Sequence, residues 1–174
     1  GYMEKWQQEK DACRKWMYAR MLYHSGGYKA ANEAYEKLYP VLRGRGAFLF
    51  EYGHSLHKSF LYGDSNKYLE EACRYSSDPM VLNVMGKNYQ EQHCYEQAEK
   101  FFYRAIHRLP GRIYPYYLLA NLYAEPDFYK PDKLKEAADS VLTKEPKVHS
   151  TAIDEMRSEV REILKRKDKC EITK

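Results

Sequence analysis

The chain has 174 residues and a formal net charge of +4, which suits one ordinary domain or a short array of repeats. Apolar residues make up 44% of it, enough for a packed core, whereas the mean hydropathy is −0.82. No apolar run approaches the roughly 20 residues of a membrane span, so we expect no direct membrane insertion. The mild basicity argues against nucleic-acid binding.

The chain begins Gly1-Tyr2 without a starting Met and without a charged-then-apolar leader. We therefore expect that this segment contains no signal peptide and that it belongs to a longer native protein. Glycine (9) and proline (7) are sparse, and tyrosine is abundant (18). Few helix breakers among many Lys, Glu, Ala and Leu residues favour helices.

Small and aromatic residues recur along the chain with a period near 34 residues. The small residues are separated by 34, 33 and 34 positions, and four tyrosines repeat the same spacings. Missing such a period would misassign the fold, so it takes precedence over single motifs. The two rows are Ala19, Gly53, Gly86 and Ala120, then Tyr28, Tyr62, Tyr95 and Tyr129.

The third copy of this pattern is the most complete. Its apolar and small residues have helical spacing in two successive stretches, and Pro110 follows them. These positions are Leu82, Met85, Gly86, Tyr89, Tyr95, Ala98, Phe102 and Ala105. The pattern resembles the tetratricopeptide (TPR) repeat, in which a small residue lets two helices of a hairpin pack closely. Stacking of such hairpins forms the core.

The resemblance implies an all-α solenoid of about four helix-turn-helix units over residues 2–148. The predicted repeats are 12–45, 46–78, 79–112 and 113–148, and the fourth carries about two extra residues within 126–131. An apolar stripe near the end predicts a capping helix over 149–167 that covers the last repeat. We expect residues 168–174 to be a disordered tail.

Catalytic and metal-binding patterns are largely missing. His54 and His57 share a helix face with Glu51, but a zinc site there needs a third ligand from another helix. There is no phosphate-binding glycine loop, and no nucleophile stands with a base and an orienting group. We therefore predict no catalytic residue, no metal site and no cofactor. Four cysteines without a C-x-x-C pair read as free thiols, although their even number permits two disulfides.

In TPR proteins the first helix of each repeat lines a concave groove. The residues expected there combine cationic, amide and aromatic side chains, which suit an extended peptide or an acidic chain terminus. Some relatives clamp a C-terminal carboxylate with Lys, Asn and Arg, and the nearest candidates here are Asn83, Lys87 and Asn121, although the full clamp pattern is not present. Solvated groove walls and sugar stacking on exposed rings stay open as alternatives. The predicted groove residues are Trp16, Arg20, Phe50, His54, Asn83, Lys87, Tyr117 and Asn121.

Several longer strings carry a closer resemblance over about residues 20–165. They lie at positions 48–53, 78–80, 85–89, 112–120 and 144–148. Together they resemble the C-terminal region of the O-antigen ligase/polymerase family, in the version that ends in TPR repeats. The resemblance implies a protein-binding domain tethered to the inner membrane through a missing N-terminal region, in surface polysaccharide assembly. Both sides of that membrane stay open, and the separated thiols favour the cytoplasmic, reducing side. The alternatives are a free-standing TPR adaptor or co-chaperone, or an enzyme that uses His54 and His57.

Overall fold

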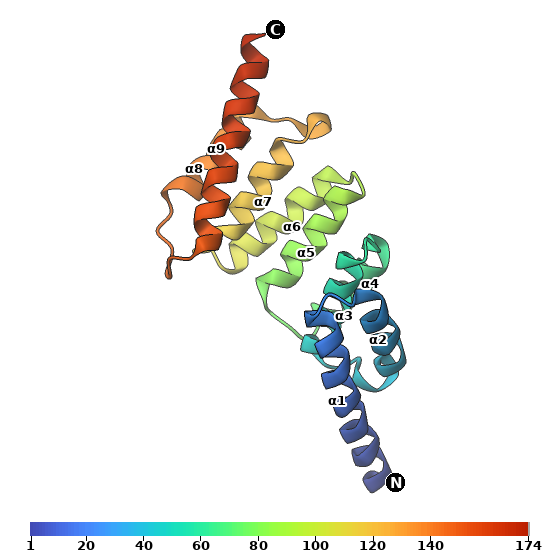
Figure 1. The fold of residues 1–174 in the computed structure, drawn as a ribbon. Coiled ribbons are helices and arrows are strands. Elements are labelled where there is room, and N and C mark those ends of the chain that lie inside the picture. Colours follow the sequence, from blue (N-terminus) through green and yellow to red (C-terminus); the bar gives the residue numbers. More distant parts are fainter. Residues whose placement is uncertain (174) are drawn as a thin grey trace. The chain divides into compact units, whose positions relative to one another are not determined.

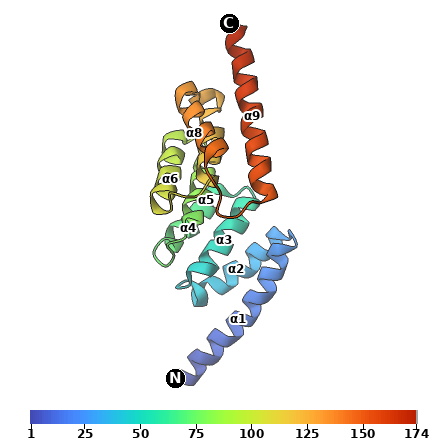
Figure 2. The same cartoon turned by 90° about the vertical axis from the view of Figure 1, so that its left-hand side faces the viewer.

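The computed structural model describes residues 1–173, which form nine α-helices, one short 3-10 helix and no strand (Figure 1, Figure 2). This confirms the all-α prediction. In chain order the elements are α1 (Tyr2–His24), α2 (Tyr28–Leu42), α3 (Gly46–Lys58), α4 (Tyr62–Ala72), α5 (Pro79–Glu91), α6 (Tyr95–Arg108), α7 (Tyr114–Tyr123), η1 (Pro126–Phe128), α8 (Pro131–Thr143) and α9 (Thr151–Ile172).

The helices belong to two compact units. The first unit, Gly1–Asn88, contains α1 to α4 and most of α5, and the second, Tyr89–Lys174, contains the end of α5 and α6 to α9. Each predicted repeat contains two consecutive helices. The first helix differs from the prediction because α1 begins at Tyr2, ahead of the expected repeat start at residue 12.

Within the first unit, α1 packs against α2, and α3 packs against α4. Both pairs cross at small, fully buried residues, such as Ala19 of α1 and Ala31 of α2. Large side chains fill the space around these crossings, and burying each one contributes about 1.5–3 kcal/mol. The largest fully buried ones here are Tyr35, Phe48, Leu42, Leu49, Leu69 and Leu82.

The closest approach in this unit lies at Gly53, between α3 and α4. A Cβ atom at this position would lie 2.5 Å from Cδ2 and 2.6 Å from Cγ of Leu69, and 3.3 Å from the carbonyl oxygen of Ser65. Leu69 is fully buried, so its side chain or the helix that carries it would have to shift to make room. The Ser65 hydroxyl also donates a 2.6 Å hydrogen bond to the Gly53 carbonyl, so the two helices are joined where they nearly touch.

Three of the turns between paired helices share one geometry. Gly26, Phe60 and His93 all have positive φ, at 86°, 64° and 61°, and each stands two residues before a repeated tyrosine. The next N–H in each turn donates to a carbonyl five residues earlier, which is the Schellman pattern of helix C-termini. These bonds run from Gly27 to Leu22 (2.8 Å), Leu61 to Leu56 (3.0 Å) and Cys94 to Tyr89 (2.8 Å).

The second unit has a core shared by α6, α7, α8 and α9. Ala98, Ala120 and Ala138 are fully buried at its helix contacts, and α9 buries Val160 and Ile163 against this core. The extra residues of the fourth repeat form η1. Their contribution is Phe128, whose ring stacks 5.5 Å from Tyr95 and 6.2 Å from Tyr123. The inserted residues therefore add an aromatic side chain that packs at the end of the α7–α8 hairpin.

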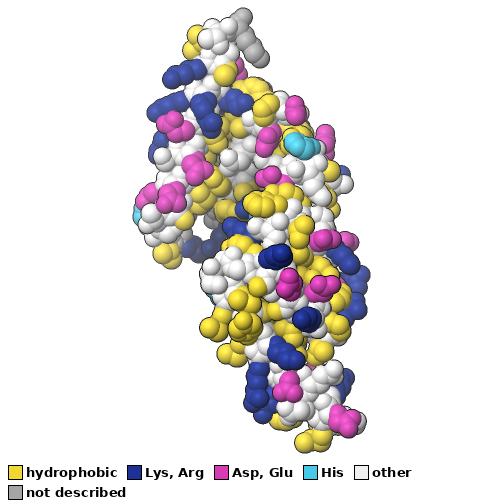
Figure 3. All heavy atoms as spheres, turned by 45° about the vertical axis from the view of Figure 1, so that its right-hand side comes forward, with side chains coloured by type: hydrophobic (Ala, Val, Ile, Leu, Met, Phe, Trp, Pro, Cys, Tyr) yellow, Lys and Arg dark blue, Asp and Glu magenta, His cyan; other side chains and the backbone are white. Residues whose placement is uncertain are grey.

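The predicted disordered tail is wrong for residues 168–172, because α9 continues to Ile172; Lys174 lies outside the described residues. This stretch has no glycine or proline, so no residue ends the helix there. Tyr129 also holds it: its hydroxyl donates to Glu171 Oε1 (3.0 Å), and Lys167 Nζ lies 4.6 Å from its ring centre. Figure 3 shows Lys and Arg side chains along this end of α9.

Replacing Gly53 with alanine should destabilise the first unit. The added methyl group would overlap Leu69, and overpacking of this kind costs about 1–3 kcal/mol, of which better helix propensity returns up to about 1 kcal/mol. Urea unfolding should therefore show a net loss of about 1–2 kcal/mol. Gly44→Ala is the matched control, because a Cβ there meets nothing within 4 Å. A Gly53→Ala protein as stable as the parent would disprove the close packing.

Candidate functional site

The predicted groove residues lie in pairs on the first helices of the repeats. Trp16 and Arg20 are on α1, Phe50 and His54 on α3, and Asn83 and Lys87 on α5, all in the first unit. Tyr117 and Asn121 are on α7 in the second unit. Members of each pair stand four residues apart, so each pair occupies one helix face.

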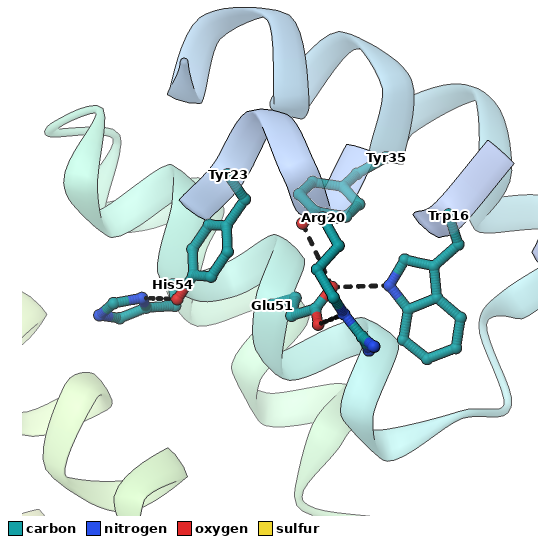
Figure 4. Close-up of polar contacts among 6 residues, drawn as sticks. All are labelled: Trp16, Arg20, Tyr23, Tyr35, Glu51 and His54. Atoms are coloured by element: carbon teal, nitrogen blue, oxygen red, sulfur yellow. Dashed lines mark hydrogen bonds and ion pairs between the residues drawn. The ribbon is translucent and has the colours of Figure 1, made fainter. Parts of the chain in front are cut away.

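Glu51 connects these side chains, although the sequence did not single it out for this role. Trp16 Nε1 donates to Glu51 Oε2 (2.6 Å), and Arg20 Nε donates to Oε1 (2.5 Å). The Tyr35 hydroxyl, from α2, adds a third bond to Oε2 (3.2 Å). Figure 4 shows the three donors converging on this carboxylate from two helices. One acid therefore holds α1, α2 and α3 in register.

The Arg20–Glu51 pair is only partly shielded from water. The Glu51 side chain is 13% exposed, and that of Arg20 is 43% exposed. The guanidinium also lies over the indole of Trp16, 4.8 Å from its centre. Within residues 1–173, Arg20 makes hydrogen bonds through Nε alone, so its Nη groups are available to a further acceptor. Burial, followed by the charge and hydrogen bond of Glu51, raises the pKa of Tyr35, which therefore stays protonated.

Three rings form a ladder along the half-exposed face of α3. Phe50 stacks on His54 at 5.7 Å with 14° between the planes, and His54 stacks on His57 at 5.8 Å with 20°. Tyr23 of α1 hydrogen-bonds Nδ1 of His54 (Figure 4). Burial, with smaller effects from His57, Lys58 and Lys87, lowers the pKa of His54 to about 4. His54 is therefore neutral near pH 7, and its Nδ1 can accept a hydrogen bond from the Tyr23 hydroxyl.

His57 belongs to a second buried network that connects α3, α4 and α5. Its Nδ1 lies 2.6 Å from Asn88 Oδ1, while Asn88 Nδ2 donates to Ser65 Oγ and Asn66 Oδ1, both at 2.8 Å. Because the amide nitrogen donates both of these bonds, Asn88 Oδ1 must accept, so His57 carries its proton on Nδ1. Burial is the main cause that lowers the pKa of His57. Neither histidine has the surroundings of a metal ligand, and the described residues contain no group of three or more His, Cys, Asp or Glu placed to hold a metal ion.

The amide residues of the predicted clamp lie in unexpected places. Asn83 is 3% exposed rather than open to the groove, and its Oδ1 accepts no hydrogen bond within the part of the chain described. Asn121 donates to the carbonyl oxygen of Tyr117 on its own helix (3.0 Å). Lys87 is half-buried and acts electrostatically on both histidines. The three residues lie on the first helices of the third and fourth repeats, and the sequence did not indicate the burial of Asn83.

Tyr117 is held by α9 in the second unit. Its hydroxyl donates to Glu159, and burial followed by this bond raises the pKa of Tyr117 to about 12. The helix that covers the last repeat therefore also contacts a predicted groove residue. Within residues 1–173 none of the four cysteines forms a disulfide. None of the described helices is long and apolar enough to cross a membrane.

Glu51 should contribute measurably to the stability of the first unit. Glu51→Gln keeps an acceptor but removes the charge paired with Arg20, and should cost about 1–2 kcal/mol. Glu51→Ala leaves three donors without their acceptor and should cost about 2–4 kcal/mol. Denaturant unfolding gives both values, with Glu70→Ala, an exposed acid on α4, as the control. Equal stability of Glu51→Ala and the control would show that the cluster contributes nothing.

His54 should make the protein less stable in mild acid. Between pH 6.5 and about 4, the unfolded chain binds a proton that the buried native ring does not, so stability falls as the pH drops through this window. The loss attributable to His54 is about 1–2 kcal/mol after allowing for solvent screening of a partly exposed ring. Melting temperatures from pH 7 to 4 should therefore fall less steeply in His54→Gln. The exposed His107→Gln should keep the parental slope, and an unchanged slope in His54→Gln would contradict the prediction.

Comparison with known proteins identifies the fold. No family model matches the chain, and no curated protein matches it. Among solved structures, residues 41 to the end of MamA from Desulfovibrio magneticus RS-1 superpose with a TM-score of 0.66 at 17% identity, over 85% of this chain and 76% of that one. PilF of Pseudomonas aeruginosa has a TM-score of 0.67 at 16% identity, over 90% and 70%.

A third similar structure is described as consisting of TPR-like repeats. The nearly identical TPR-like repeats of a Podospora anserina protein described as a kinesin light chain superpose with a TM-score of 0.65 at 12% identity. They cover 94% of this chain and 91% of that one. At such identities the likeness concerns the fold alone. The chain therefore has the fold of TPR-like repeat proteins, as its 34-residue period predicts.

Proposed function

We propose that this chain is a non-catalytic protein-interaction module, and that a partner segment binds the groove residues of the first unit. The observation that carries the proposal is the preorganised face of α1 and α3. There the ring of Phe50 and the guanidinium of Arg20 are partly exposed. Arg20 is held in place by its hydrogen bond to Glu51, and Phe50 is held by its stacking on His54. A face that is already ordered loses little side-chain entropy when it binds.

The chemistry of this face favours a peptide with both apolar and acidic side chains. The Nη groups of Arg20 can donate to a carboxylate, and the stacked rings of Phe50 and His54 offer flat apolar area beside them. His54 is neutral near pH 7, so it adds no competing charge. In the second unit we propose the same role for the α7 face that carries Tyr117 and Asn121.

The wider context is also a proposal. The strings that resemble the O-antigen ligase/polymerase family support a domain tethered to the inner membrane that recruits a protein during surface polysaccharide assembly, and the separated thiols favour its cytoplasmic side. The alternative is a free-standing adaptor or co-chaperone. The two differ in the size of the native protein. An immunoblot of membrane and soluble fractions separates a large membrane-bound parent from a soluble chain near 20.7 kDa.

A photo-crosslinker in place of Phe50 should capture the partner in cells of the source organism. Lys87→Glu should lower the yield of that adduct roughly tenfold, because it reverses a charge beside the bound segment. The yield of the same adduct in Asn121→Ala tests whether the α7 face also contributes to binding the partner. Circular dichroism checks that each variant keeps its helicity.

The matched controls are a crosslinker in place of Phe60 and the charge reversal Lys37→Glu. Phe60 is another exposed phenylalanine of the same unit, and Lys37 is an exposed lysine on α2. Neither position belongs to the proposed binding face. The same adduct from position 60, or a yield that Lys87→Glu leaves unchanged, would refute binding at this face.

A further inference from the structure

The second unit contains an apolar cleft that the proposed function does not use. It has a volume of about 560 Å³ and lies where the α6–α7 connection meets the α8–α9 connection and the first turns of α9. Figure 1 shows both connections at the same end of this unit. A volume of this size falls within the range of ordinary ligand pockets. Its apolar lining consists of Leu109, Ile113, Pro146, Val148, Ile153 and Met156.

The charged groups of this cleft have one sign. Arg112 and Lys147 line it and are both exposed, and the lining includes no Asp or Glu. Neither cation forms an ion pair within residues 1–173. Of the nearby acids, Asp154 is paired with His149 (3.1 Å), whereas Glu145 is exposed next to Pro146. Two positive charges thus border an apolar floor without a negative partner in the lining.

The start of α7 and the start of α9 add to this positive field. Ile113 and Ser150 are the residues before these two helices, and both line the cleft. The N-terminal end of a helix carries partial positive charge that favours an anion. The Ser150 side chain does not cap its own helix, so it does not satisfy the first N–H groups of α9. The floor, the two cations and the two helix ends therefore favour the same kind of ligand.

We propose that this cleft is a second docking site, which binds an acidic peptide segment through one apolar anchor. The anchor side chain enters between Ile113, Val148 and Met156, and carboxylates on either side of it pair with Arg112 and Lys147. The exposed position of Val148, at 77%, leaves the entrance open. A lipid surface fits less well, because membrane-binding patches use about 4–8 basic residues and this cleft has two. All of these residues belong to the second unit, so the site is separate from the face of α1 and α3.

The probe is a fluorescein-labelled peptide, DEDLFDED, titrated with the full chain and followed by fluorescence anisotropy. We expect saturable binding that weakens as salt is added, because the carboxylate pairs are exposed to solvent. Replacing the central Leu-Phe with Ala-Ala, or the acids with Asn and Gln, should each weaken binding at least about tenfold. Absence of saturable binding up to about 1 mM, or equal binding of any of these peptides, would overturn the proposal.

Variants of the protein locate the site. Arg112→Glu with Lys147→Glu should weaken peptide binding at least about tenfold. Lys135→Glu with Arg161→Glu makes the same change in net charge at exposed positions of α8 and α9 outside the cleft, and should leave binding within about twofold. Far-UV circular dichroism confirms that both proteins are folded. Equal loss in the two variants would mean non-specific attraction and would reject the site.

A lipid surface is tested directly in the same series. Vesicles that contain phosphatidylserine should bind the parent and the Arg112→Glu with Lys147→Glu variant alike. Vesicle binding that depends on these two residues, without peptide binding, would assign the cleft to membranes and contradict the proposal. Because the face of α1 and α3 also favours acidic and apolar side chains, the cleft variants are titrated in a Lys87→Glu background as well. A loss of peptide binding caused by Lys87→Glu reports on the first proposed site, and a further loss caused by Arg112→Glu with Lys147→Glu reports on the cleft, so failure of the two sites is distinguishable.

Discussion

The close approach of paired helices is the constraint on which the rest of this structure depends. Where Gly53 meets Leu69, a Cβ atom would lie 2.5 Å from the leucine side chain, and the Ser65 hydroxyl joins the two helices at that point. Fully buried alanines stand at other helix contacts, Ala19 and Ala31 in the first unit and Ala120 and Ala138 in the second. Because the two helices of each hairpin pack together at small residues, side chains on their outer faces are not needed for this contact. Ser65 belongs both to this contact and to the buried polar network of Asn88, because its hydroxyl donates to the Gly53 carbonyl and accepts from Asn88 Nδ2.

The Glu51 cluster orders side chains at the surface of the helices, whereas the small residues order their core. A carboxylate at a helix interface is costly to remove from water, and its pairing with Arg20 recovers that cost only in part. What the cluster adds is order, because indole, guanidinium and phenol must all point at one acid. Side chains held in this way cannot adapt freely to many ligands. A surface built like this favours a narrow range of partners.

The repeat period predicted most of the fold, because close packing restricts residue size at fixed intervals and this restriction is visible in the sequence. The polar contacts were not predictable in the same way. Glu51 stands in an otherwise apolar stretch, and this pattern could have indicated a buried, paired acid. The residues close to Glu51 in the sequence do not show that Arg20, Trp16 and Tyr35 are its hydrogen-bond donors. The burial of Asn83 was missed because helix periodicity indicates a face and not what covers it. The order of α9 beyond residue 167 depends on Tyr129, which lies 42 residues before Glu171.

The three Schellman turns show that different residues of this chain adopt one turn conformation. A left-handed residue ends the first helix of three repeats, yet only Gly26 is a glycine, while Phe60 and His93 adopt the same conformation. Bulky residues there carry a backbone cost of about 1–2 kcal/mol, which the surrounding hairpin tolerates. The three turns therefore have the same chain path although only one of them carries a glycine. The feature that they share is the hydrogen bond from the residue after the turn to a carbonyl five residues earlier, so a pattern that required glycine at this position would find one of the three turns.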